Sequence, residues 1–132
     1  MTYHSRFLDR DFTFETGSIT KLKKKYKLEN IEDANGLTFI DPAMTVHIWM
    51  PSFSATSPTD ISVLSHEIVH AACYGLDFAQ IPLFQRTDDG DLNTEALAYL
   101  VGELTEAFLS KVPKAKSKAV KQRRSKKDYH QT

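Results

Sequence analysis

The chain has 132 residues, a mass of 15.0 kDa and no net charge, and 41% of its residues are hydrophobic and 26% charged. This length and composition fit one globular domain and exclude a chain that is disordered throughout. No apolar run approaches the roughly 20 residues of a membrane-spanning helix, and the polar first ten residues lack the apolar segment of a secretory signal. The single cysteine, Cys73, excludes a disulfide scaffold, so we expect a cytoplasmic protein without membrane contact.

The zero net charge conceals an uneven distribution. Nine of the 17 Lys and Arg residues lie in residues 111–132 beside one acidic residue, Asp128, whereas residues 1–110 hold 16 of the 17 acidic residues. The tail has almost no large apolar side chains, so burial cannot offset the entropy lost on ordering it. We therefore expect a folded domain over residues 1–111 and a basic tail over residues 112–132 that is disordered or forms a frayed helix.

Short strands and one helix are predicted in the first half of the chain. The segment DFTFET (residues 11–16) alternates between polar and apolar residues, which favours a strand. Apolar residues at helical spacing predict a helix over residues 19–28. We expect its lysines to form a solvated face, and a nucleic-acid-binding patch is the alternative. Two further strands are expected at LTFI (residues 37–40) and at MTVHIWM (Met44–Met50), which Pro51 ends.

Two longer helices are predicted in the second half. Ser57 as N-cap, Pro58 at the first helical position and Gly75 as a stop predict a helix over residues 58–75. A final helix is expected over residues 94–110, and it carries an apolar stripe formed by Leu97, Leu100, Val101, Leu104 and Phe108.

The first of these two helices contains the motif His66-Glu67-Ile68-Val69-His70, an H-E-x-x-H pattern. Residues i and i+4 stand one turn apart on one face of a helix, so the imidazoles of His66 and His70 can reach one zinc ion. Glu67 is rotated off the metal axis but stays close enough to touch a metal-bound water, which is the position of a general base. The alternative is a surface helix in which these His and Glu residues are incidental.

A catalytic zinc ion needs a third protein ligand. The metzincin extension of the motif fails, because Cys73 stands where it requires Gly and Leu76 where it requires His. Glu95, at the start of the next helix, is the leading candidate, and Glu103 and Glu106 are weaker ones. The alternative for Glu95 is an acidic residue that the dipole of its helix favours in the first turn.

The pattern HEIVH, followed about 25 residues later by EALAY on a helix, resembles the gluzincin branch of zinc metallopeptidases. The segments VLSHEIVH and EALAYL are further similar to small HExxH proteins encoded by tailed phages and prophages, which implies the host cytoplasm as location. The resemblance covers about residues 36–109. It implies an α+β, minimal zincin-like fold, with a small mixed β-sheet, an active-site helix and a following Glu-bearing helix.

The same resemblance implies site residues. His66, His70 and Glu95 would be the Zn²⁺ ligands, and Glu67 would be the catalytic base. Tyr99 departs from the pattern, because thermolysin-like gluzincins carry at this position an Asp that orients a zinc-bound His.

Zincins also suggest a place for the substrate. The strand before the active-site helix, Met44–Met50, is expected to pair with a substrate peptide at the edge of the sheet. Tyr99 is the leading candidate for donating a hydrogen bond to the oxyanion, and Tyr74 and His47 are alternatives. For His47 an exposed strand histidine without a catalytic role is the preferred interpretation.

Three functions are compatible with these features. The first is a zinc-dependent peptidase, in which Glu67 takes a proton from a zinc-activated water and passes it to the leaving amine. The second is a catalytically silent, zinc-stabilised binding or assembly protein, and the third is a nucleic-acid-associated protein whose basic tail contacts phosphates. Glu67 favours the peptidase, because a structural zinc site does not need that carboxylate. The sequence contains no pattern that identifies a substrate or an oligomeric state.

Overall fold

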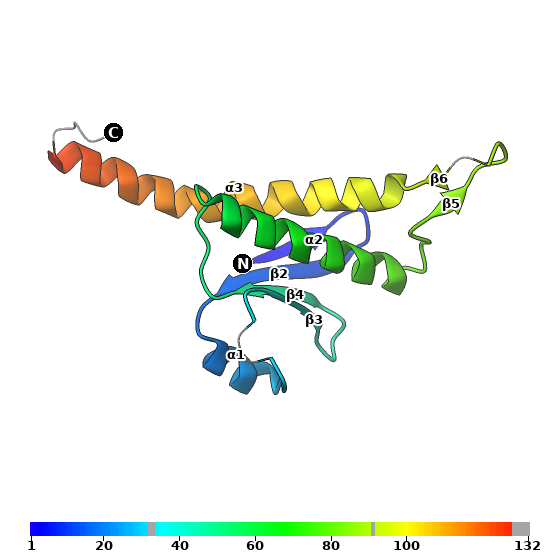
Figure 1. The fold of residues 1–132 in the computed structure, drawn as a ribbon, viewed down its shortest axis with the longest axis horizontal. Helices are drawn as coiled ribbons and strands as arrows, with labels where there is room; N and C mark the ends of the chain where they lie inside the picture. The colour runs from blue at the N-terminus through cyan, green and yellow to red at the C-terminus, as the bar shows by residue number, and fades with distance from the viewer. Residues whose placement is uncertain (32–33, 91, 128–132) are drawn as a thin grey trace.

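The computed structural model describes the backbone of residues 1–31, 34–90 and 92–127, and the side chains of residues 1–31, 34–90 and 94–111. A four-stranded sheet carries the two long helices on one face and the short helix on the other (Figure 1). The elements in chain order are β1 (Thr2–Ser5), β2 (Arg10–Thr16), α1 (Ile19–Tyr26), β3 (Leu37–Ile40), β4 (Val46–Met50), α2 (Pro58–Phe78), β5 (Gln85–Arg86), β6 (Leu92–Asn93) and α3 (Glu95–Lys127). The predicted α+β class and the mixed sheet are confirmed.

The strand order in the sheet is β1-β2-β4-β3. β2 and β4 are parallel, whereas β1 pairs with β2 and β3 pairs with β4 in antiparallel fashion. β4 is therefore a central strand, with neighbours on both sides, and the sheet edges are β1 and β3. The prediction that Met44–Met50 pairs with a substrate is wrong for this reason, because its backbone hydrogen-bonding groups are already used within the sheet.

The core lies between the sheet and the two long helices. Side chains alternate across a strand, so one face of β2 and β4 meets α2 and α3 while the other face meets α1. Every residue of β4 is buried, because the strand is covered on both faces. The buried cluster consists of Phe12, Phe14, Val46, Ile48, Met50, Phe53, Leu64, Ile68, Ala71, Ala72, Leu76, Leu100, Leu104 and Phe108.

The helix caps follow the expected chemistry in part. The Ser18 side chain accepts hydrogen bonds from the backbone N–H groups of Thr20 and Lys21 at the start of α1. At α2, Ser57 accepts from the N–H of Asp60, but the Asp60 carboxylate binds the N–H of Ser54 instead of the cap residue. Of the two reciprocal hydrogen bonds of a capping box, only the one that Ser57 accepts is therefore present, and Asp60 fixes the preceding loop instead.

Several boundaries differ from the predicted ones. α1 ends at Tyr26, because Lys27 adopts a left-handed conformation with φ 55°. β4 begins at Val46, since Met44 has φ 69° in the turn after β3. α2 continues through Gly75 to Phe78, and a Cβ on Gly75 would lie 2.8 Å from the Phe12 ring, so this glycine allows close packing and does not stop the helix.

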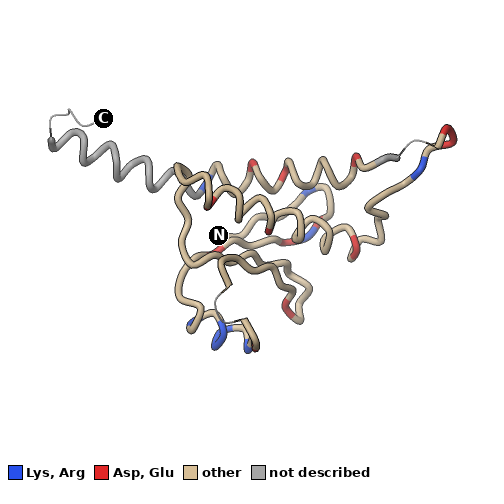
Figure 2. The backbone as a smooth tube through the Cα atoms, viewed as in Figure 1, with Lys and Arg blue, Asp and Glu red and all other residues tan. Residues whose placement is uncertain are grey.

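β1, β5 and β6 were not predicted, and α3 is longer than expected. α3 continues into the basic tail as far as Lys127, and residues 128–132 lie outside the described part. The lysines of α1 gather at the end of the molecule that projects from the sheet (Figure 2). Within the described residues, no helix combines the length and the hydropathy needed to cross a membrane.

Candidate metal centre

The two histidines of the HEIVH motif lie side by side on the exposed face of α2. Their Nε2 atoms are 3.2 Å apart, and their ring centroids are 4.8 Å apart. If both nitrogens bound one zinc ion at about 2.0–2.1 Å, the N–Zn–N angle would be about 100°, close to the tetrahedral value. The His66 and His70 imidazoles therefore fit two corners of a zinc site, as the spacing in the sequence predicts. The same distance also suits a hydrogen bond between one protonated and one unprotonated nitrogen.

The Glu67 side chain extends from α2 towards the edge strand β3. Its side chain is 7% exposed, and the Thr38 hydroxyl lies within hydrogen-bond distance of two of its oxygens, Oε1 at 2.7 Å and the backbone oxygen at 3.1 Å. A buried carboxylate needs such partners, because an unpaired charge loses its hydration on burial. The sequence analysis assigned no function to Thr38, whose one local feature is that it lies two residues after Asn35-Gly36, a pair typical of turns.

Gly36 allows the chain to approach α2 just before β3 begins. A Cβ at this position would lie 2.7 Å from Cγ1 of Val63 and 3.1 Å from both Cγ and Oε2 of Glu67. Glycine is needed here for space and not for a left-handed φ, since Gly36 has none. In the sequence, Asn35-Gly36 is typical of a turn, and this local pattern does not predict the contact with Glu67.

Glu95, the predicted third ligand, does not form a metal-binding group with His66 and His70. Glu95 is exposed in the first turn of α3, and the described residues contain no group of three His, Cys, Asp or Glu side chains arranged around one point. α2 and α3 share the core through residues such as Ala72 and Leu104, whereas His66 and His70 lie on the exposed side of α2. The set of His66, His70 and Glu95 is therefore not assembled in this structure.

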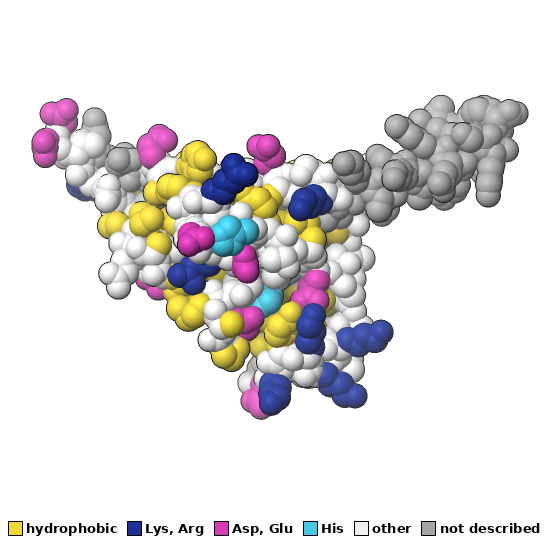
Figure 3. Space-filling view, turned by 180° about the vertical axis from the view of Figure 1, so that it is seen from behind, with side chains coloured by type: hydrophobic (Ala, Val, Ile, Leu, Met, Phe, Trp, Pro, Cys, Tyr) yellow, Lys and Arg dark blue, Asp and Glu magenta, His cyan; other side chains and the backbone are white. Residues whose placement is uncertain are grey.

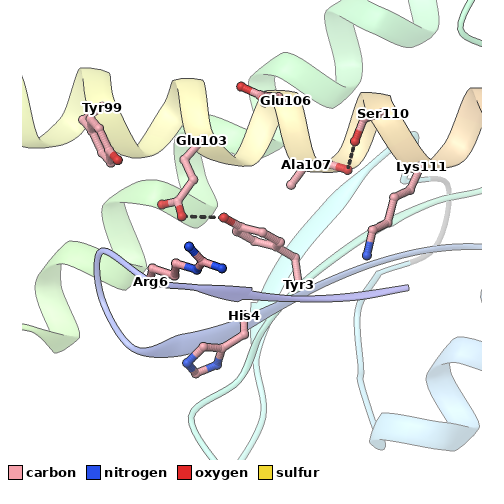
Figure 4. Close-up of a pocket in the computed structure, with 9 residues that line it drawn as sticks. All are labelled: Tyr3, His4, Arg6, Tyr99, Glu103, Glu106, Ala107, Ser110 and Lys111. Carbon is pink, nitrogen blue, oxygen red and sulfur yellow. Dashed lines mark hydrogen bonds between the residues drawn. The ribbon is translucent and has the colours of Figure 1, made fainter.

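The Glu103 side chain links α3 to β1 through hydrogen bonds. It accepts hydrogen bonds from the Tyr3 hydroxyl at 2.5 Å and from the Ser5 hydroxyl at 2.9 Å, which ties β1 to α3. The hydrogen bond to this carboxylate, together with burial, raises the pKa of Tyr3 to about 12. Glu103 therefore faces β1, whereas the Glu106 side chain points away from the strand (Figure 4).

The three candidates for the oxyanion donor occupy different places. Tyr99 is 61% exposed and packs on Phe7 with ring centroids 5.0 Å apart, on the side of α3 that faces β1 (Figure 4). Tyr74 lies four residues after His70 and is therefore on the same face of α2 as the His pair. Tyr74 is accordingly the candidate closer to the HEIVH motif.

His47 lies on the face of the sheet opposite α2, and the expectation of an exposed strand histidine is wrong. It is 5% exposed, its Nδ1 lies 2.6 Å from the Thr13 hydroxyl and its Nε2 lies 2.8 Å from the Asp41 carboxylate. Burial alone would raise the pKa of Asp41, but hydrogen bonds from His47 and the Thr45 N–H lower it below its usual value. Figure 3, the view from behind Figure 1, shows histidine and acidic side chains next to each other on the surface of the molecule. His47 is thus a satisfied structural residue and no oxyanion donor for the α2 site.

Comparison of the chain with protein-family models, with curated proteins and with solved structures finds no match. The functional assignment therefore depends on the geometry of the residues around the HEIVH motif. In this geometry His66 and His70 have a spacing that fits zinc, and the buried carboxylate of Glu67 on the same helix is oriented by the Thr38 hydroxyl.

Proposed function

We propose that the chain is a zinc-dependent metallopeptidase of the HExxH type, with His66 and His70 as metal ligands. The observation that carries this proposal is the 3.2 Å separation of the two Nε2 atoms, with Glu67 next to His66 on the same helix. A bound zinc ion would polarise a scissile carbonyl and lower the pKa of a water molecule. Glu95 remains the proposed third ligand, as the resemblance of HEIVH and the later EALAY segment to gluzincins implies.

Glu67 is the proposed general base. Thr38 donates a hydrogen bond to Oε1, so Oε2 is the oxygen proposed to take a proton from the attacking water and to deliver it to the leaving amine. Burial beside Gly36 keeps the carboxylate in one orientation. Such positioning lowers the entropic cost of reaching the transition state.

The proposed substrate is a peptide in extended conformation, and β3 is the strand proposed to pair with it. β3 is an edge strand of the sheet, and Thr38 on this strand contacts Glu67. Backbone pairing along β3 would bring the peptide alongside the HEIVH helix by β-strand addition. This assignment replaces the earlier one to Met44–Met50.

Zinc binding is the first test. We expect one zinc ion per wild-type chain by elemental analysis, and loss of the ion in His66→Ala and in His70→Ala. Ser65→Ala, an exposed neighbour on the same helix, is the matched control and should retain the ion. Glu95→Gln against Glu106→Gln on α3 then tests the third ligand, and equal zinc affinity in these two variants would exclude Glu95. A wild-type chain that binds no zinc more tightly than His66→Ala would overturn the proposal.

Turnover is the second test, with Glu67→Gln in a peptide-library cleavage assay. The amide keeps the shape but removes the base, so zinc should stay bound while cleavage falls by about 10²-fold or more.

A second candidate, a zinc-stabilised binding or assembly protein, is favoured by the burial of Glu67, which suits a structural role. Full zinc occupancy without any cleavage would select it. The nucleic-acid alternative depends on tail side chains outside the described residues and stays a prediction.

A further inference from the structure

A groove of about 670 Å³ runs between β1 and α3, at the opposite edge of the sheet from β3 (Figure 4). Tyr3 and Arg6 line it from the strand side, and Glu103, Ala107 and Lys111 line it from the helix side. None of these residues belongs to the HEIVH site. A groove between an edge strand and a helix is the geometry in which extended peptides are bound by strand addition.

The outer edge of β1 offers backbone hydrogen-bonding groups to this groove. The Met1 amine donates to the Phe14 oxygen at 2.8 Å, and the Phe14 N–H donates to the Met1 oxygen at 3.0 Å. Hydrogen-bonded and non-hydrogen-bonded pairs alternate along an antiparallel ladder, so Tyr3 also bonds to β2, while Thr2 and His4 direct their N–H and C=O groups outward. Within the described part of the chain, no backbone hydrogen bond from outside the sheet reaches Thr2 or His4.

The side chains of the groove favour a negatively charged occupant. The Glu103 carboxylate accepts hydrogen bonds from the Tyr3 and Ser5 hydroxyls, and the raised pKa of Tyr3 keeps its proton in place. Glu106 also lines the groove, but its side chain points away from β1 (Figure 4). Among the residues that the structure describes, Arg6 and Lys111 form no ion pair with an acidic side chain. Arg6 and Lys111 therefore outnumber Glu103, the one labelled carboxylate that points towards β1, and this excess of positive charge gives the groove a preference for carboxylates.

One end of the groove also offers an apolar contact. Tyr99 and Phe7 are 61% and 41% exposed and pack against each other, and Figure 4 places Tyr99 and Lys111 at opposite ends. Exposed aromatic side chains of this kind are typical anchors for a partner. Between the two ends, the small side chains of Ala107 and Ser110 leave room for a strand.

We infer that this groove binds an extended, acidic segment of a partner protein, which pairs with the outer edge of β1. One large apolar side chain of the segment packs on Tyr99 and Phe7, and its carboxylates face Arg6 and Lys111. The inference is independent of the proposed zinc chemistry, because it uses other residues at the other edge of the sheet.

A displayed library of random 12-residue peptides, selected on the full chain, tests this assignment. We expect the enriched peptides to be acidic and to contain a large apolar residue. The most enriched peptide, labelled with fluorescein, is then titrated by fluorescence anisotropy. His4→Pro removes an outward N–H, which an edge strand tolerates, whereas His4→Thr removes the same side chain and keeps the N–H. Affinity should fall at least tenfold in His4→Pro relative to His4→Thr.

Lys111→Glu provides a second variant that does not disturb the strand. It should weaken binding at least tenfold with an unchanged thermal melt, whereas His66→Ala should bind as wild type does, which separates this inference from the zinc proposal. Enrichment of basic peptides, or equal affinity in His4→Pro, His4→Thr and Lys111→Glu, would overturn it. A wild-type dimer that His4→Pro converts to a monomer would also overturn it, because a second copy of the chain would then occupy the edge.

Discussion

The Thr38 hydroxyl lies 2.7 Å from Oε1 of Glu67, so a residue of the edge strand orients the carboxylate of the HEIVH helix. The two residues are 29 positions apart in the chain, and Gly36 makes their approach possible by leaving space for Val63 and Glu67. Helix, strand and glycine together hold the carboxylate in one place.

Thr38→Val tests this contact. Valine keeps the shape of threonine but leaves a buried carboxylate without its donor, so we expect the free energy of unfolding to fall by about 1–3 kcal/mol. Urea denaturation measures the change, and Thr38→Ser, which restores the hydroxyl, should recover most of it. Equal stability of the valine and serine variants would show that the hydrogen bond does not hold Glu67.

Gly36→Ala tests the close approach of the chain to α2. Its Cβ would lie 2.7 Å from Val63, and overpacking of this kind costs about 1–3 kcal/mol of unfolding free energy. The double variant Gly36→Ala with Val63→Ala should recover part of the loss. Gly102→Ala is the matched control, because nothing lies within 4 Å of its Cβ and an exposed helical glycine gains about 0.5–1 kcal/mol on replacement by alanine. Destabilisation of the same size at both glycines would contradict the packing argument.

The Tyr3–Glu103 contact predicts a loss of stability at high pH. The pKa of Tyr3 is raised from 10.0 to about 12 in the folded state, so the folded protein holds this proton more tightly than the unfolded chain does. Its contribution to stability is complete below pH 10 and is lost as the pH rises from 10 to about 12. Urea denaturation of wild type and Tyr3→Phe at several pH values measures this, and the difference in unfolding free energy should shrink over that interval. A difference that does not change with pH would show that the phenol is not coupled to Glu103.

The tail should be dispensable for folding. Among the described side chains, the last one of α3 that packs on the core is Leu109, so a chain truncated after Lys111 should melt within a few degrees of the full chain. If the full chain binds DNA, the truncated chain should lose this binding, and the affinity of the full chain should fall steeply with salt, because counterions are released from the phosphates. A thermal melt and a DNA titration at two salt concentrations test both statements. A large drop in melting temperature would show that the tail packs on the body.

Local chemistry determined much of what was predicted correctly. The HEIVH spacing alone places His66 and His70 on one helical face, since a residue and its i+4 neighbour are one turn apart whatever surrounds them. Ser57 predicts the start of α2 because the side chain of an N-cap residue binds N–H groups only two or three residues away, and Ser18 caps α1 in the same way. Such short-range interactions are encoded within a few residues of sequence.

The tertiary structure decided the rest. Local periodicity predicts the strand β4 but not its central position in the sheet. That position follows from the parallel pairing of β4 with β2. It also buries His47, a residue of β4, beneath Tyr26 of α1. Glu103 and Tyr3 meet although they are 100 positions apart, and Glu95 does not join the His pair. The order of strands and the packing of α3 on α2 are determined by how all apolar faces are buried at once, and no single segment contains that information.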